Sequence, residues 1–224
     1  MERNTQPLPD PTGGILTEID SQCSNAFALW DLVKQLFYAK PECADIWDDI
    51  SGNAAWDLHD TLRDAVILAI CRITDPAEQG KNLNCSLSAL IAKVRVLQAV
   101  IAADQACDLQ LSHTPENRVE QQTITALNDR LVDIEKRCTP LREHRKKRIA
   151  HADVKVIASP LRQCPNSTVD DVLSKVASFL QELQRIVGWP HMMYHLGDFD
   201  GSAVLMYLKA GRKLFDLQEA IERN

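Results

Sequence analysis

Apolar residues recur along most of this chain at alternating steps of three and four, and this spacing constrains the fold more than any other feature. Residues at such steps lie on one face of an α-helix, which turns once every ~3.6 residues. In the first segment they are Ile19, Cys23, Ala26, Trp30, Val33 and Phe37. Similar stripes follow as far as residue 221, so we expect an all-α fold, a compact array of about six or more amphipathic helices.

The body of the chain contains few turn-forming residues, which argues against a many-stranded sheet. The 224 residues include 8 Gly and 10 Pro, and four of the prolines lie within the first 41 residues. Residues 1–14 are polar and Pro-rich and are predicted to be a flexible segment. Residues 15–224 are then predicted to form one helical domain.

Several local signals predict where the helices begin and end. Pro41 is expected to separate the first helix from a short second one around Trp47, and a third helix is expected from about 53 to 74. Asp75-Pro76 should end that helix, and we expect Asp75 and Asn82 to cap or brace the polar loop at 78–85. Further on, helices are expected to begin at N-caps formed by Ser86, Thr114 (followed by Pro115) and Thr168. We also expect a kink at Thr139-Pro140, a short hairpin within 152–163 and a last helix over 202–221.

Composition excludes several classes of protein. The net charge of −6 argues against a polycation that coats nucleic acid, so any nucleic-acid site must be a local basic patch. No run approaches the ~20 apolar residues of a membrane span, and the N-terminus lacks the apolar stretch of a signal peptide. The seven cysteines are an odd number at wide spacings, without a C-x-x-C pair. We therefore expect reduced, mostly buried cysteines in a cytoplasmic protein, with no zinc site and no disulfide framework.

One short segment is strongly basic. Residues 142–155 contain six Lys or Arg and only two carboxylates, with His144 and His151 among them. A bound polyanion such as RNA would relieve the repulsion between these cations and release counterions. The ordinary alternative is a solvated helix face whose cations favour a helix C-terminus. His191 and His195 are four residues apart, but no carboxylate pattern completes a metal site there, and we expect no metal and no cofactor.

The basic segment also carries a family pattern. Residues 141–153 read LREHRKKRIAHAD, in which Arg145 and His151 have five residues between them. This resembles the signature of HEPN domains, an Arg and a His separated by four to six residues near the end of a helix. Three upstream segments are similar, in kind and in order, to segments of the abortive-infection U-type branch of HEPN proteins. They are Phe37-Tyr38-Ala39-Lys40-Pro41, Ile73-Thr74-Asp75-Pro76 and Asn82-Leu83-Asn84-Cys85-Ser86-Leu87.

The resemblance implies a metal-independent endoribonuclease, a toxin or phage-defence effector that works as a homodimer, with a cognate antitoxin as a candidate partner. Arg145 and His151 would be its catalytic residues. A His with an ordinary pKa near ~6.5 can move protons at neutral pH, and an Arg can hold two phosphoryl oxygens. Surrounding basic residues would bind single-stranded RNA: Arg142, His144, Lys146, Lys147 and Arg148.

Two observations keep other functions open. Arg145 and His151 would lie about 120° apart on a regular helix, so one chain's pair need not converge without fraying or a partner chain. Lys146 stands where the family usually has Asn, His or Asp. The alternatives are a non-catalytic HEPN protein that binds RNA, a nucleotide or a partner protein, and a purely structural helical interaction module.

Overall fold

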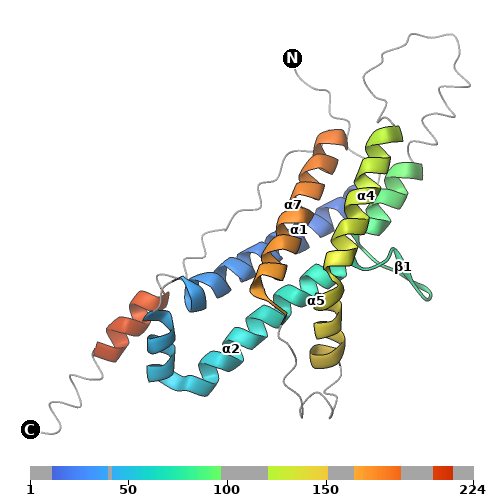
Figure 1. Cartoon of the computed structure of the whole chain (residues 1–224). Coiled ribbons are helices and arrows are strands. Elements are labelled where there is room, and N and C mark those ends of the chain that lie inside the picture. Colours follow the sequence, from blue (N-terminus) through green and yellow to red (C-terminus); the bar gives the residue numbers. More distant parts are fainter. Residues whose placement is uncertain (1–11, 40–41, 97–120, 151–163, 188–203, 214–224) are drawn as a thin grey trace, which may run out of the picture. The chain divides into compact units, whose positions relative to one another are not determined.

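The computed structural model describes residues 12–39, 42–96, 121–150, 164–187 and 204–213. Helices make up almost all of these residues, which confirms the predicted all-α class (Figure 1). The chain divides into two compact units. Unit 1 comprises Met1–Cys23 and Leu68–Tyr194, and unit 2 comprises Ser24–Ile67 and His195–Asn224. The prediction that residues 15–224 form a single domain stays a prediction.

The elements follow one another in a simple order. The first half contains α1 (Thr12–Val33), the π-helical turn η1 (Lys34–Tyr38), α2 (Glu42–Thr74), and the strands β1 (Glu78–Gln79) and β2 (Asn82–Leu83). An unlabelled helix at 87–96 comes next. The second half contains α4 (Gln121–Arg137), α5 (Thr139–His144), the π-helical turn η3 (Arg145–Ala150), α7 (Asn166–Val187) and a helix at 204–213.

In unit 1, α4 packs along α7 (Figure 1). Each helix buries the stripe that its spacing predicts. On α4 and just beyond it, the buried residues are Ile124, Leu127, Leu131, Ile134 and Cys138; on α7 they include Val172, Val176, Phe179 and Leu183. Ion pairs join the exposed edges, with Arg137 Nη1 2.8 Å from Asp171 and Lys175 Nζ 2.9 Å from Asp133. The apolar stripes therefore form the core of this unit, and charged residues border it.

A polar contact lies inside the same core. The Gln184 side chain on α7 is completely buried, and its Nε2 donates to both carboxylate oxygens of Asp20 on α1, at 3.0 and 2.9 Å. Asp20 is itself only 4% exposed. Buried polar groups need such partners, because an unmatched donor in the interior carries its full desolvation penalty.

Three helix boundaries differ from the prediction. Helix α1 begins at Thr12, so the last residues of the segment predicted to be flexible are helical. Helix α2 runs without a break from Glu42 to Thr74, where two helices were expected. Gly52 lies within it, and a single Gly weakens a helix by about 1 kcal/mol without ending it. Helix α7 begins at Asn166, so Thr168 lies inside its first turn.

The loop predicted at 78–85 is a small antiparallel hairpin. Glu78 pairs with Leu83 and Gln79 pairs with Asn82. Gly80 has a φ of 66°, a conformation that the tight turn needs and that other residues adopt poorly. Ser86 caps the next helix as predicted, since its Oγ accepts from the amide of Ala89 at 3.4 Å.

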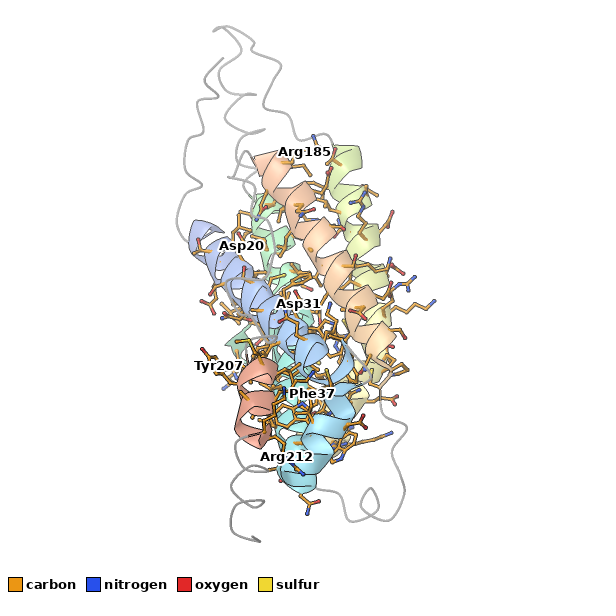
Figure 2. All side chains as sticks on the ribbon, turned by 90° about the vertical axis from the view of Figure 1, so that its left-hand side faces the viewer. Asp20, Asp31, Phe37, Arg185, Tyr207 and Arg212 are labelled. Atoms are coloured by element: carbon orange, nitrogen blue, oxygen red, sulfur yellow. The ribbon has the colours of Figure 1, made fainter. Side chains whose placement is uncertain are left out.

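Unit 2 has its own apolar cluster. Leu36, Cys43 and Leu205 are buried in it, and Phe37 and Trp47 pack against them. The Phe37 and Trp47 rings stack with centroids 5.3 Å apart, and Trp47 Nε1 donates to the carbonyl of Leu36 at 2.9 Å. Phe37 is labelled in Figure 2, where side chains of this unit crowd together.

Within the described residues, no helix has the length and apolar character needed to span a membrane. The six cysteines in this part of the chain are free thiols, and the burial of five of them agrees with the prediction of mostly buried cysteines. Cys107, the cap at Thr114-Pro115 and the hairpin expected within 152–163 lie outside the described residues.

Candidate active site

The candidate site is built on the C-terminus of α2. The helix ends at Thr74 because Asp75 precedes Pro76, which disfavours helical backbone before it and donates no hydrogen bond. Thr74 is completely buried, and its Oγ1 donates to the carbonyl of Ile70 at 2.9 Å. The last carbonyls of a helix have no partner within it and form the negative end of its dipole, so this end favours cations.

Arg145 supplies one of these cations. Its Nη1 donates to both oxygens of the Asp75 carboxylate, at 2.9 and 3.2 Å. The side chains are 28% and 15% exposed, so the pair lies at the edge of the interior. The hydrogen bond to Asp75 raises the pKa of Arg145 above its ordinary value. Asp75 therefore fixes where the planar guanidinium lies.

Arg142 supplies the second cation. Its Nη2 donates to the carbonyl of Thr74, and its Nη1 donates to the carbonyl of Glu135 on α4 at 3.2 Å. Arg142 and Arg145 are three residues apart, so they lie on neighbouring positions of one helix face. We call these two arginines with Thr74 and Asp75 the α2 clamp. It attaches the start of the basic segment to the end of α2 (Figure 1).

Buried side chains lie behind the clamp. His144 is 5% exposed, and Cys71, Cys138 and Leu141 are completely buried. Burial raises the pKa of the Cys71 thiol to about 12, although Arg145 opposes this shift. Burial also raises the pKa of Cys138. Both sulfurs are therefore neutral thiols at physiological pH, unsuited to act as nucleophiles.

The remaining basic residues face outward. Lys146 and Lys147 are exposed, and Arg148 is half-buried. Lys147 Nζ lies 3.7 Å from Glu143, and both side chains are about half exposed or more, at 47% and 64%, so this ion pair is weak. The structure thus divides the basic segment into an inner part, Arg142, His144 and Arg145, and an outer part that includes both lysines.

The helix changes its winding at the motif. Helix α5 ends at His144, and η3 is π-helical from Arg145 to Ala150. The regular helical winding that was assumed for the angle of about 120° therefore does not hold over Arg145–Ala150. Single π-helical turns often occur at functional sites. His151 itself lies outside the described residues, as do His191 and His195.

A family model described as AbiU2, of the HEPN type, matches residues 13–204. The chain belongs to the AbiU2 family of HEPN proteins. The match covers most of the chain, including the α2 clamp, η3 and the Arg145–His151 interval, and it confirms the resemblance seen in the sequence. No curated protein and no solved structure matches the chain.

In this AbiU2-family chain, sequence reasoning missed the partner of Arg145. Asp75 was expected to brace the following loop, but its carboxylate binds Arg145. The loop is held instead by Asn84, whose Nδ2 donates to the carbonyl of Pro76 at 2.8 Å. The available signal was the position of Asp75 within the family-like segment Ile73-Thr74-Asp75-Pro76, 70 residues before the motif Arg.

Within the described residues, no three side chains of the metal-binding types gather into a candidate metal site.

Proposed function

We propose that this protein is a metal-independent endoribonuclease of the cytoplasm that acts on single-stranded RNA as a toxin or phage-defence effector. Membership of an abortive-infection HEPN family supports the proposal. The observation that carries it is the clamped position of Arg145. Its guanidinium is held through Nη1 alone in the ion pair with Asp75, at the start of the π-helical turn that leads toward His151.

Arg145 would stabilise the phosphate as it reacts. A guanidinium has five N–H donors in one plane, and the ion pair with Asp75 uses only Nη1. Its Nε and Nη2 could then approach two phosphoryl oxygens of RNA and offset the charge that develops on them. The exposed Lys146 and Lys147 would contact neighbouring phosphates.

His151 would move the protons. RNA carries its own nucleophile, so the enzyme needs to deprotonate a 2′-OH and to protonate the departing 5′-oxygen. The 2′-oxygen forms a bond to phosphorus as the bond to the 5′-oxygen breaks, which yields a 2′,3′-cyclic phosphate and a 5′-OH. A second copy of the chain would supply the other proton-transfer group, which is the reason to propose a homodimer.

Burial suggests a division of labour among the predicted RNA-binding residues. Arg142 donates to two backbone carbonyls, and His144 is 5% exposed, so both are better placed to position the segment than to contact RNA. Lys146 and Lys147, both exposed, and the half-buried Arg148 are the better candidates for phosphate contacts.

The decisive experiment measures cleavage of a labelled single-stranded RNA and identifies the new ends. We expect cyclic phosphate ends, no effect of EDTA, and a loss of about 10²–10⁴ in rate for His151→Ala, because a general acid–base group is removed. Arg145→Lys should not restore an Arg145→Ala variant fully, because Lys lacks the planar fork. A wild-type protein that is inert on diverse RNAs would refute the proposal, and equal cleavage by His151→Ala would refute the site.

The toxin role has its own test. Expression of the wild type should halt growth of the host cells, while His151→Ala at the same protein level should not. A neutralising antitoxin is the partner that this role implies. If both proteins halted growth, the toxicity would not depend on catalysis by His151.

Two observations favour a second candidate, a non-catalytic HEPN protein that binds RNA. Arg145 already pairs with a carboxylate, and Lys146 replaces the usual polar residue beside it. RNA binding by fluorescence anisotropy without any cleavage, and with unchanged affinity in His151→Ala, would establish this candidate in place of the enzyme.

A further inference from the structure

Unit 2 contains a hydrogen-bonded chain of three side chains that the proposed ribonuclease does not use. The imidazole of His59 contacts the Tyr38 hydroxyl through Nε2 and the Asp60 carboxylate through Nδ1, at 3.1 Å for the latter. His59 is on α2, and Tyr38 is the last residue of the π-helical turn η1. An imidazole placed between a hydroxyl and a carboxylate is the arrangement that activates nucleophiles in enzymes.

The carboxylate determines which nitrogen of His59 carries the proton. Asp60 accepts a hydrogen bond, so in the neutral ring the proton belongs on Nδ1. Nε2 then has a free lone pair and accepts from the O–H of Tyr38. His59 can therefore take the phenolic proton when the Tyr38 oxygen attacks an electrophile, and Asp60 stabilises the resulting imidazolium.

Aromatic packing makes this arrangement rigid while the phenol stays accessible. His59 is 5% exposed, and Phe37 and Trp56 meet its ring edge-to-face, with centroids 5.0 and 5.8 Å away. Tyr38, in contrast, is 46% exposed and Trp56 is 63% exposed. The base is thus shielded from water, while the nucleophile and an adjacent indole remain open to a ligand.

We propose that Tyr38 is a base-activated nucleophile that accepts an acyl group from an uncharged ester, with His59 as the general base and Asp60 as its positioning residue. An uncharged donor is favoured because residues 34–63 contain six carboxylates against three Lys or Arg, and this excess of negative charge disfavours phosphorylated donors. The exposed face of Trp56 favours a donor with an aromatic group.

The reaction involves one bond made and one broken. The Tyr38 Oη bonds to the carbonyl carbon, and the bond from that carbon to the ester oxygen of the leaving group breaks. The phenolic proton moves to His59 Nε2 and is then released to the leaving alkoxide or to water. The products are an O-acyl tyrosine and the alcohol or phenolate of the donor.

The probe is p-nitrophenyl acetate, applied to the full-length protein, with acetylation of each tyrosine followed by peptide mass spectrometry. Tyr207 is the matched control within the same molecule, because it is 72% exposed and lies on the helix at 204–213 (Figure 2). If exposure alone decided reactivity, Tyr207 would react faster. We expect Tyr38 to react about 10²-fold faster than Tyr207, the usual benefit of a positioned general base.

Variants then test each role. His59→Gln should slow acetylation of Tyr38 to the rate of Tyr207, and Tyr38→Phe should abolish the modified peptide. Should His59→Gln fail to fold, as judged by circular dichroism, Asp60→Asn provides the test, because the Asp60 side chain is 31% exposed. Asp60→Asn should slow Tyr38 and leave Tyr207 unchanged. Equal rates for the two tyrosines in the wild type, or a Tyr38 rate unaffected by the foldable variant, would overturn the proposal.

Discussion

Arg145 combines two roles in one side chain. It is the motif residue of an AbiU2-family chain, and it also neutralises the carboxylate that follows α2. Both roles need the guanidinium in a fixed place, and the contact of Nη1 with both carboxylate oxygens of Asp75 provides it. Asp75 is therefore as much a part of the candidate site as the motif itself.

Exchanging the two charges separates these roles. Asp75→Asn should lower the free energy of unfolding by about 1 kcal/mol, because the ion pair is only partly buried. The exchanged variant, Asp75→Arg with Arg145→Asp, should recover part of that stability, since the charges remain opposite. It should stay inactive on RNA, because the guanidinium then lies at the wrong position. Thermal unfolding and RNA cleavage are measured on the same samples, with Asp75→Arg and Arg145→Asp as the single variants and Asp75→Asn as the neutral reference.

An exchanged variant that regains cleavage together with stability would show that only the ion pair matters and that Arg145 contacts no phosphate. A wild type without cleavage would instead count against the ribonuclease proposal itself, so the two failures are distinguishable.

At the scale of the elements, a buried polar contact between Gln184 and Asp20 joins α1 to α7 in the core of unit 1. Gln184→Ala should lower the free energy of unfolding by about 1–3 kcal/mol, because it removes a completely buried side chain and leaves Asp20 without this donor. Urea denaturation followed by circular dichroism measures the change. Gln181→Ala, a half-buried position on the same helix, is the control and should have a smaller effect. Equal losses for both variants would contradict the special role of the contact.

The outer part of the basic segment should determine how RNA binding responds to salt. Replacing Lys146 and Lys147 together by Ala should weaken binding and reduce the slope of log affinity against log salt by about 1.4, since two phosphate contacts are lost from a single strand. Anisotropy titrations across a range of KCl concentrations measure this slope. The paired control is Lys93→Ala with Arg95→Ala, two exposed cations on the helix at 87–96. An equal change in the control would indicate a general charge effect and no site.

Element by element, the sequence predicts best where one physical signal dominates. The apolar stripe from Ile124 on α4 to Cys138 is buried as its spacing predicts. Ser86 caps the helix at 87–96, as expected from its position before that helix. The break expected before α2's second half was wrong because Gly52 weakens a helix without removing a donor. The π-helical winding of η3 could not be predicted, since the same apolar spacing fits regular and widened turns.

The candidate site was predictable only in part, for a similar reason. Arg145 follows from a short local pattern, whereas its partner Asp75 lies 70 residues away and is brought to it by tertiary packing. No periodicity in the chain indicates such a pair. The same holds for Tyr38 and His59, which are 21 residues apart on different elements.

At the scale of the whole molecule, the proposed mechanism requires two copies. We expect a homodimer in which the Arg145–His151 segments face each other across a two-fold axis, because an isologous contact brings the same segment from both chains together. The exposed lysines should line a groove at this contact, since like charges repel when they are buried. Light scattering at micromolar concentration should give twice the chain mass of 25.1 kDa. A monomer under these conditions would count strongly against the paired site.

If Arg145 binds an RNA phosphate as proposed, the Asp75 carboxylate competes with that phosphate for the guanidinium. It is attached to the same chain, so its effective concentration at the guanidinium is very high, and a lone phosphate must compete with it from solution. A long RNA would face the same competition, but the exposed Lys146 and Lys147 would hold its backbone beside the site. The ion pair would thus make inorganic phosphate and mononucleotides poor inhibitors, and the site would respond to polymers in a cell full of small phosphates.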